Sequence, residues 1–83
     1  MPYVYLLRCA DGSLYCGWTS DPERRLRQHQ AGTASRYTKR RRPVEYALLI
    51  PADDRSAALR EEARIKKLSR REKLSLIGTG GIG

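Results

Sequence analysis

The N-terminal residues carry the pattern that most restricts the fold. Residues 3–9 (YVYLLRC) and 13–18 (SLYCGW) are rich in aromatic and β-branched types, which favour strands. The residues between them, Ala10-Asp11-Gly12, are a turn signal, because glycine adopts positive φ without strain. The segment therefore predicts a β-hairpin, and the rest of the chain has to pack against this pair of antiparallel strands.

The length of the turn decides which hairpin side chains share a face, because residues alternate between faces along a strand. A two-residue loop would pair Tyr5 with Trp18, and Tyr5 and Tyr15 would then lie on opposite faces. A three-residue loop with a left-handed Gly12 pairs Tyr5 with Gly17 instead. Tyr5, Tyr15 and Gly17 then share a face, and Gly17 leaves room beside the Tyr5 ring. We predict the three-residue loop.

The middle of the chain predicts a helix, a loop and a strand. Asp21 can cap the first helix, and Pro22 suits its first turn. This helix is expected to reach about residue 30 and to stop at Gly32. Residues 33–43 (TASRYTKRRRP) are expected to form a polar basic loop, and residues 44–50 (VEYALLI) a third strand closed by a proline.

Two further helices are expected after this strand. One is predicted at roughly residues 56–68, and the next opens with the capping box that Ser69 forms with Glu72. The order β-β-α-β-α-α predicts an α+β fold, in which a small three-stranded antiparallel sheet is flanked by helices. Residues 1–78 are expected to form a single domain, followed by a glycine-rich flexible tail at 79–83.

The charge of the chain favours a polyanionic partner. Seventeen Lys and Arg against nine Asp and Glu give a net charge of +8 over 83 residues, which points to nucleic acid before a membrane. The apolar runs are too short to span a bilayer, and the apolar start lacks the basic leader of a signal peptide. One histidine and two cysteines exclude a multi-histidine metal site and a disulfide scaffold. We expect a cytoplasmic protein in which Cys9 and Cys16 are reduced.

The basic residues are concentrated in two windows. Residues 36–42 hold five and residues 64–73 hold six of the seventeen positive charges, and most are arginines, which suit bidentate phosphate contacts. A solvated charged surface would show the same clustering, but the net charge favours contact with a phosphate backbone. The residues predicted to bind nucleic acid are Gly17, Arg36, Lys39, Arg40, Arg41, Arg42, Lys66, Lys67 and Arg70.

One carboxylate interrupts the apolar stripe of the second predicted helix. The stripe runs through Ala58, Ile65 and Leu68, and Glu61 falls on it at helical spacing. A buried carboxylate is unfavourable unless it is paired or binds a cation. Glu61 is therefore either a cation ligand or the partner of an arginine in an ion pair.

Two polar residues share a face of the first predicted helix. Arg25 and His29 are four residues apart, and such a pair can hold a phosphate and move a proton. The spacing also arises by chance in many helices. The hairpin tyrosines are usually core residues, but a tyrosine can act as a general base where cations stabilise its ionised form.

In combination, these residues resemble the GIY-YIG nuclease superfamily. The two halves of the signature correspond to Tyr3-Val4-Tyr5 and Tyr15-Cys16-Gly17, and the resemblance covers about residues 2–77. Arg25, His29 and Glu61 follow in the family's order. Two departures are the tyrosine at position 3, where the signature has glycine, and the lack of a counterpart to the family's terminal phosphate-binding asparagine. The small stand-alone bacterial members are the most similar group.

The resemblance implies a divalent-metal-dependent phosphodiesterase. It implies that Glu61 binds one Mg²⁺ or Mn²⁺, that Tyr15 activates the water, and that Arg25 steadies the phosphate, with Tyr5 and His29 beside them. DNA is favoured over RNA, in repair or recombination, with a protein partner supplying specificity to a monomeric module. The alternative is a basic nucleic-acid-binding module without catalysis, which would account for the charge only.

Overall fold

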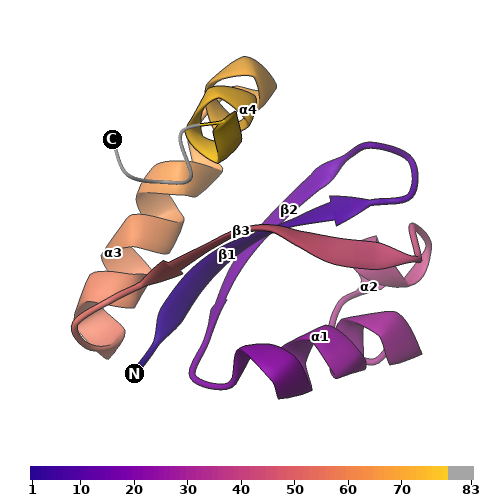
Figure 1. The fold of residues 1–83 in the computed structure, drawn as a ribbon, viewed down its shortest axis with the longest axis horizontal. Coiled ribbons are helices and arrows are strands. Elements are labelled where there is room, and N and C mark those ends of the chain that lie inside the picture. Colours follow the sequence, from indigo (N-terminus) through magenta and orange to yellow (C-terminus); the bar gives the residue numbers. More distant parts are fainter. Residues whose placement is uncertain (79–83) are drawn as a thin grey trace.

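The hairpin is the centre of the fold. In the computed structural model, which describes residues 1–78, strand β1 (Tyr3–Cys9) pairs antiparallel with β2 (Leu14–Thr19). Strand β3 (Val44–Pro51) pairs antiparallel with the other side of β1, so the sheet order is β2-β1-β3 and β2 is an edge strand (Figure 1). The predicted α+β class and the three-stranded antiparallel sheet are confirmed. The tail predicted at 79–83 lies outside the described residues.

The hairpin has the predicted register. Tyr5 lies opposite Gly17 and Leu7 lies opposite Tyr15, as a three-residue loop requires. The Cys9 N–H donates to the Ser13 carbonyl at 2.9 Å, and Gly12 has φ +83°. Only a residue that tolerates positive φ closes this loop without strain. The loop length therefore puts both tyrosines on one face of the sheet.

The long helices begin where their capping residues predict. Helix α1 (Pro22–Ala31) starts after Asp21, whose carboxylate accepts from the Arg24 N–H, and it ends at a left-handed Gly32. Asp54 caps α3 (Arg55–Lys66) in the same way. Helix α4 (Arg70–Gly78) opens with the predicted capping box, because the Ser69 hydroxyl and the Glu72 carboxylate each accept a backbone N–H of the other residue.

The predicted basic loop contains a helical turn that the sequence analysis did not include. Helix α2 (Arg36–Lys39) is one turn long, and the Ser35 hydroxyl caps it by accepting the Tyr37 N–H at 3.1 Å. Thr38 is fully buried within it. A four-residue segment has no apolar period to detect, and this turn is held by a cap and by its contact with α1. The predicted order is thus correct for the longer elements, with α2 added between α1 and β3.

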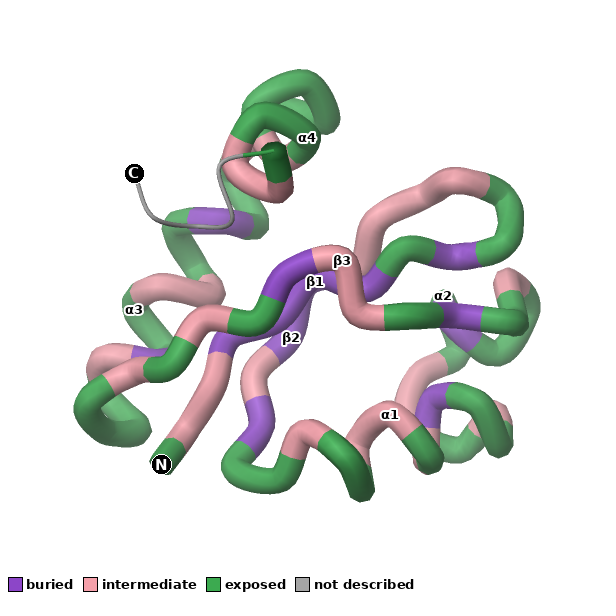
Figure 2. Tube along the Cα trace, in the orientation of Figure 1, coloured by how far each residue is buried: buried purple, intermediate pink, exposed green. Residues whose placement is uncertain are grey.

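The sheet buries side chains on both faces. One face carries Val4, Leu6 and Cys16 against α3 and α4, and the other carries Tyr5 and Leu7 against α1. Figure 1 shows α3 and α4 on one side of the sheet and α1 and α2 on the other, and Figure 2 shows buried stretches on all three strands. The domain therefore has three layers with the sheet in the middle.

An extra residue lets β3 contribute side chains to both helical layers. Leu7 lies opposite Tyr46 whereas Leu6 lies opposite Leu48, so Ala47 is a bulge without a partner on β1. Tyr46 packs on the face of α1, and Leu48, two residues later, packs on the face of α3. A regular strand would place both residues on the same face.

The two cysteines lie on opposite faces of the sheet. Cys9 packs with Tyr5 and Leu7, Cys16 packs with Val4 and Leu6, and both are free thiols. The sheet between them separates the two thiols, and their predicted reduced state stays a prediction. Over residues 1–78, none of the helices has the length and apolar character needed to cross a bilayer.

Candidate active site

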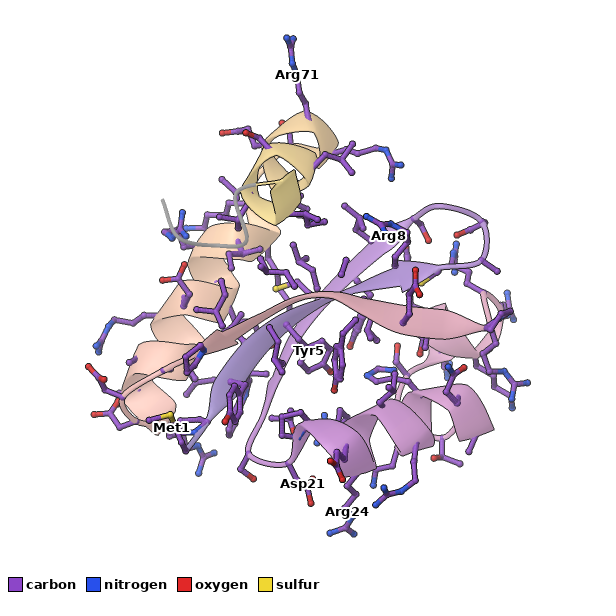
Figure 3. The ribbon with its side chains drawn as sticks, in the orientation of Figure 1. Met1, Tyr5, Arg8, Asp21, Arg24 and Arg71 are labelled. Atoms are coloured by element: carbon purple, nitrogen blue, oxygen red, sulfur yellow. The ribbon has the colours of Figure 1, made fainter. Side chains whose placement is uncertain are left out.

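Four of the five predicted catalytic residues meet between the sheet and α1. The Tyr5 ring centroid lies 6.5 Å from that of Tyr15 and 5.8 Å from that of His29, and the Tyr15 and His29 centroids are 5.4 Å apart. Figure 3 shows Tyr5 pointing from the sheet towards α1. Arg25, on the same helix, is half-buried, and its charge acts on both Tyr5 and His29. The hairpin register and the i, i+4 spacing in α1 together produce this cluster.

Both nitrogens of the His29 ring are hydrogen-bonded. Nε2 lies 2.9 Å from the Tyr5 hydroxyl, and Nδ1 lies 2.8 Å from the Thr38 hydroxyl. The Thr38 hydroxyl donates its proton to the Ser35 carbonyl at 3.4 Å, so it accepts from Nδ1–H. Nε2 is then the unprotonated nitrogen, and Tyr5 donates to it. We therefore assign Tyr5 as a neutral phenol that is held in place by His29.

Burial shifts the protonation of this pair. It raises the pKa of Tyr5 to about 12, against the opposing effect of the neighbouring Arg25 guanidinium. Burial, and then the positive charge of Arg25, lower the pKa of His29 to about 4. At neutral pH the imidazole is uncharged and the phenol keeps its proton. His29, which is 1% exposed, thus orients Tyr5 and does not offer a charge to a phosphate.

The lowered pKa of His29 predicts that the fold loses stability in mild acid. An unfolded histidine takes up a proton near pH 6.5, whereas the folded one does so only near pH 4. Between these values the unfolded state binds more protons, so the free energy of unfolding decreases as the pH falls. We expect a loss of about 2 to 3 kcal/mol between pH 7 and pH 4.5, measured by urea unfolding.

The matched control is His29→Gln, which keeps one donor and one acceptor but does not titrate. The carboxylates titrate in both proteins, so the difference between the two pH profiles isolates the histidine. Equal slopes in the two proteins would show that His29 is not the group responsible.

Gly17 has a clear packing role beneath Tyr5. A Cβ at this position would lie 2.5 Å from the Tyr5 hydroxyl and 2.6 Å from Cζ of the ring. The missing side chain therefore leaves room for the Tyr5 ring beside Gly17, as the sequence analysis predicts. Gly17 is itself buried, and its predicted contact with nucleic acid stays a prediction.

Two residues of the cluster were missed by the sequence analysis. Thr38 anchors α2 to His29, and Tyr46 packs its ring against Tyr5 with centroids 5.3 Å apart. The Tyr46 hydroxyl donates to the Pro22 carbonyl at 2.7 Å, which fixes the start of α1 on β3. Tyr46 lies in a predicted strand and could have been proposed as a core aromatic, but nothing in the sequence marks Thr38.

Glu61 comes from the opposite layer. It lies on α3, which packs on the face that carries Cys16, whereas the tyrosines face α1. Its side chain is 33% exposed, and among the described residues the hydrogen bonds of its carboxylate are with Arg64. Of the two alternatives for this stripe, the structure shows the ion pair, since Glu61 lies between the fully buried Ala58 and Ile65 and is paired with Arg64. Glu61 can approach Tyr15 only around the edge strand β2.

The surroundings of Glu61 fit a divalent ion only in a minimal way. No three His, Cys, Asp or Glu side chains gather as a metal site within residues 1–78. Nε and Nη2 of Arg64 both donate to Oε1, which leaves Oε2 of the part-exposed carboxylate for a cation. Mg²⁺ retains several waters and is often held by one or two carboxylates together with substrate phosphate, so a single carboxylate is compatible with it.

The basic loop residues fall into two kinds. Arg41 is ion-paired with Asp11 at 3.1 Å and donates to the Tyr37 carbonyl, and Arg42 donates to the Lys39 and Gln30 carbonyls. These two arginines tie the loop to the hairpin and to α1. The other basic residues among the predicted contacts are exposed, namely Arg36, Lys39, Arg40, Lys66, Lys67 and Arg70.

Comparison with known proteins identifies close relatives. The chain is 51% identical over 76 residues to a UPF0213 protein of Syntrophus aciditrophicus, covering 90% of this chain and 87% of that protein. It is 41% identical over 80 residues to the UPF0213 protein YhbQ of Escherichia coli, covering 96% and 80%. The solution structure of the protein EF2693 from E. faecalis matches with a TM-score of 0.65 and 43% identity over 98% of this chain and 86% of that one.

A second solved structure is similar over nearly the whole chain. The UPF0213 protein of Bacillus halodurans matches with a TM-score of 0.63 and 38% identity, over 99% of this chain and 88% of that chain. The family model described as the GIY-YIG catalytic domain matches residues 1–75, which include the tyrosine, arginine, histidine and glutamate positions discussed above. The chain therefore belongs to the GIY-YIG family.

Proposed function

We propose that this protein is a metal-dependent endonuclease that hydrolyses phosphodiester bonds of nucleic acid. The observation that carries the proposal is the cluster in which Tyr5, Tyr15 and Arg25 surround a neutral His29. Clusters of titratable side chains with shifted pKa values are typical of functional sites. This cluster lies on a molecule of net charge +8, which attracts a polyanionic substrate.

The hydrogen bonds of the two tyrosines indicate different roles for them. Tyr5 is buried and donates to His29, so it is poorly placed to accept a proton from water. Tyr15 is half-buried and lines a surface depression together with Lys66. We assign Tyr15 as the general base and Tyr5 as the residue that positions His29 and the Tyr15 ring.

The proposed reaction is an in-line hydrolysis. Tyr15, as the general base, takes a proton from water, and the water oxygen forms a bond to phosphorus while the bond to the leaving sugar oxygen breaks. Arg25 binds the phosphate oxygens, and the leaving oxygen takes a proton from solvent. A divalent ion held by Glu61 and by the substrate phosphate would neutralise the charge that develops on the phosphate. Mg²⁺ or Mn²⁺, and DNA in preference to RNA, are the proposed cofactor and substrate.

The test is a cleavage assay on end-labelled branched, single-stranded and duplex substrates with Mg²⁺ or Mn²⁺. We expect the unaltered protein to cut at least one of them and to lose the activity in a chelator. Glu61→Gln should lower the cleavage rate by about 100-fold or more, because it removes the only carboxylate proposed for the ion.

The matched control is Glu62→Gln. Glu62 is the neighbouring carboxylate on the same helix, and its ion pair is with Lys66 at 3.7 Å. We expect this variant to retain cleavage. If Glu61→Gln cleaves like the unaltered protein and keeps its metal dependence, the proposed role of Glu61 is wrong.

One observation favours a second candidate, a nucleic-acid-binding module without catalysis. Glu61 is already engaged by Arg64 and comes from a different layer than the tyrosines. In that case all substrates would be bound and none would be cut with either ion. Roles in repair or recombination, and a partner that supplies specificity, are proposed for the nuclease only.

A further inference from the structure

A groove follows the open edge of β2. One surface depression, of about 320 Å³, is lined by Leu14, Tyr15, Cys16, Ser35, Tyr37 and Lys66. A second, of about 190 Å³, is lined by Ser13, Leu14, Tyr37, Arg70 and Lys73. They share two lining residues, so they adjoin, and we call them together the edge groove. Because consecutive residues of β2 from both faces line it, the edge groove lies along the outer side of the strand.

The two banks of the edge groove differ in chemistry. The bank formed by β2 and α2 is aromatic and apolar, with the Tyr15 and Tyr37 ring centroids 5.7 Å apart. The bank formed by α3 and α4 carries three positive charges, on Lys66, Arg70 and Lys73. Arg70 is fixed there because it donates to the Gly12 carbonyl at 2.8 Å.

Tyr37 presents a rigid, exposed ring to this groove. Tyr37 is 40% exposed, although its ring is large and apolar. The Arg41 guanidinium carbon lies 3.9 Å from the ring centroid and so covers one face. Arg41 is itself held by Asp11 at 3.1 Å, and the Ser35 cap fixes the backbone of Tyr37. The orientation of the ring is therefore set before any ligand binds.

We propose that the edge groove is a binding site for unpaired nucleotides, in which a nucleobase stacks on Tyr37 and the phosphates follow Lys66, Arg70 and Lys73. This inference rests on the proposed function and deepens it. Charged grooves with aromatic platforms are how proteins hold single strands, because an unpaired base offers its face for stacking. In a duplex the bases are stacked on each other, and only the backbone would meet this surface.

The position of the edge groove relates the site to cleavage. Tyr15, the proposed base, lines one end of it, and the hairpin loop lies at the other. A nucleotide stacked on Tyr37 would thus be next to the phosphate presented to Tyr15. The preferred substrate is then a strand with unpaired nucleotides beside the scissile bond.

Binding without divalent ions tests the site separately from catalysis. Fluorescence anisotropy would be measured in a chelator with labelled single-stranded DNA, single-stranded RNA of the same sequence, and the corresponding DNA duplex. Tyr37→Ala should weaken single-strand binding by about 5- to 100-fold and change duplex binding less than about twofold. Tyr37→Trp should retain single-strand binding. Comparing the affinities for single-stranded DNA and RNA of the same sequence shows which sugar the site prefers.

Two controls separate stacking from charge and from loss of an exposed apolar group. Tyr37→Ala leaves every charge in place, so the dependence of affinity on salt should not change, whereas Lys66→Ala should reduce that slope by about one. Leu59→Ala removes another exposed apolar side chain, on α3 outside the groove, and should bind normally.

The outcomes distinguish this inference from the proposed function. Suppose that the unaltered protein binds single strands and duplex equally, and that Tyr37→Ala binds both with unchanged affinity. The stacking site is then overturned, while the proposed nuclease function is unaffected. If the unaltered protein binds none of the three nucleic acids, the proposed function fails, and the inference with it.

Discussion

Tyr15→Phe should lower the cleavage rate by about 100- to 10,000-fold and leave the fold intact. Phenylalanine keeps the ring, which packs against Tyr5, His29 and Tyr37, and removes only the hydroxyl that is proposed to accept the proton. The rate would be measured at saturating substrate and metal, and the fold by circular dichroism and thermal unfolding. Cleavage at an unchanged rate by Tyr15→Phe would assign the base to another group.

Tyr5→Phe is the informative comparison because its hydroxyl is bonded inside the protein. Its loss leaves the buried Nε2 of His29 without its partner, which should destabilise the fold by about 1 to 3 kcal/mol. For a domain of this size that corresponds to a decrease in Tm of roughly 4 to 8 °C per kcal/mol. Tyr15→Phe should therefore lose activity at an unchanged Tm, whereas Tyr5→Phe should have a lower Tm. Equal Tm values for both would contradict the hydrogen bond to His29.

Gly17→Ala should be among the most damaging single methyl additions in the chain. The new Cβ would lie under 3 Å from two atoms of the Tyr5 side chain, Cζ and the hydroxyl oxygen, and the ring is confined by Tyr46 and His29. Overpacking of this kind destabilises by about 1 to 3 kcal/mol and displaces side chains. We expect a decrease in Tm of roughly 5 to 20 °C, measured by thermal unfolding, and a loss of cleavage because Tyr5 and His29 move.

The chain offers both a control and a rescue for this change. Gly78→Ala places a Cβ where no atom lies within 4 Å, so its Tm should change little. Tyr5→Leu combined with Gly17→Ala removes the clashing part of the ring, and should be more stable than the sum of the two single changes predicts. Additive effects would show that the destabilisation caused by Gly17→Ala does not arise from its contact with Tyr5.

The parts of the fold that local rules control were predictable. The parity of the hairpin loop fixes the face of Tyr5 and Tyr15, and capping side chains such as Asp21 and Ser69 mark helix starts within a residue or two. Thr38 was not predictable because its role depends on a hydroxyl that meets His29 across two elements. The ion pair of Glu61 was one of two open alternatives, since a helical stripe does not reveal which neighbour turns towards it.

The arginines of the basic loop show a second limit of sequence reasoning. Arg41 and Arg42 look like their neighbours in the sequence, but the structure uses their donors to hold the loop on the hairpin and on α1. Charge composition gives the net charge of the molecule. It does not tell which guanidinium groups are engaged within the protein, because that depends on carbonyls from distant segments.

The bulge at Ala47 means that β3 could lose one residue at that position and keep its packing. Deleting Ala47 would make Tyr46 and Leu48 neighbours, and neighbours in a regular strand face opposite sides of the sheet, as these two already do. Deleting Leu49 instead would turn Ile50 away from α3. A relative whose alignment has a one-residue gap at position 47 would therefore keep the partners of both helical layers, on a strand without the bulge.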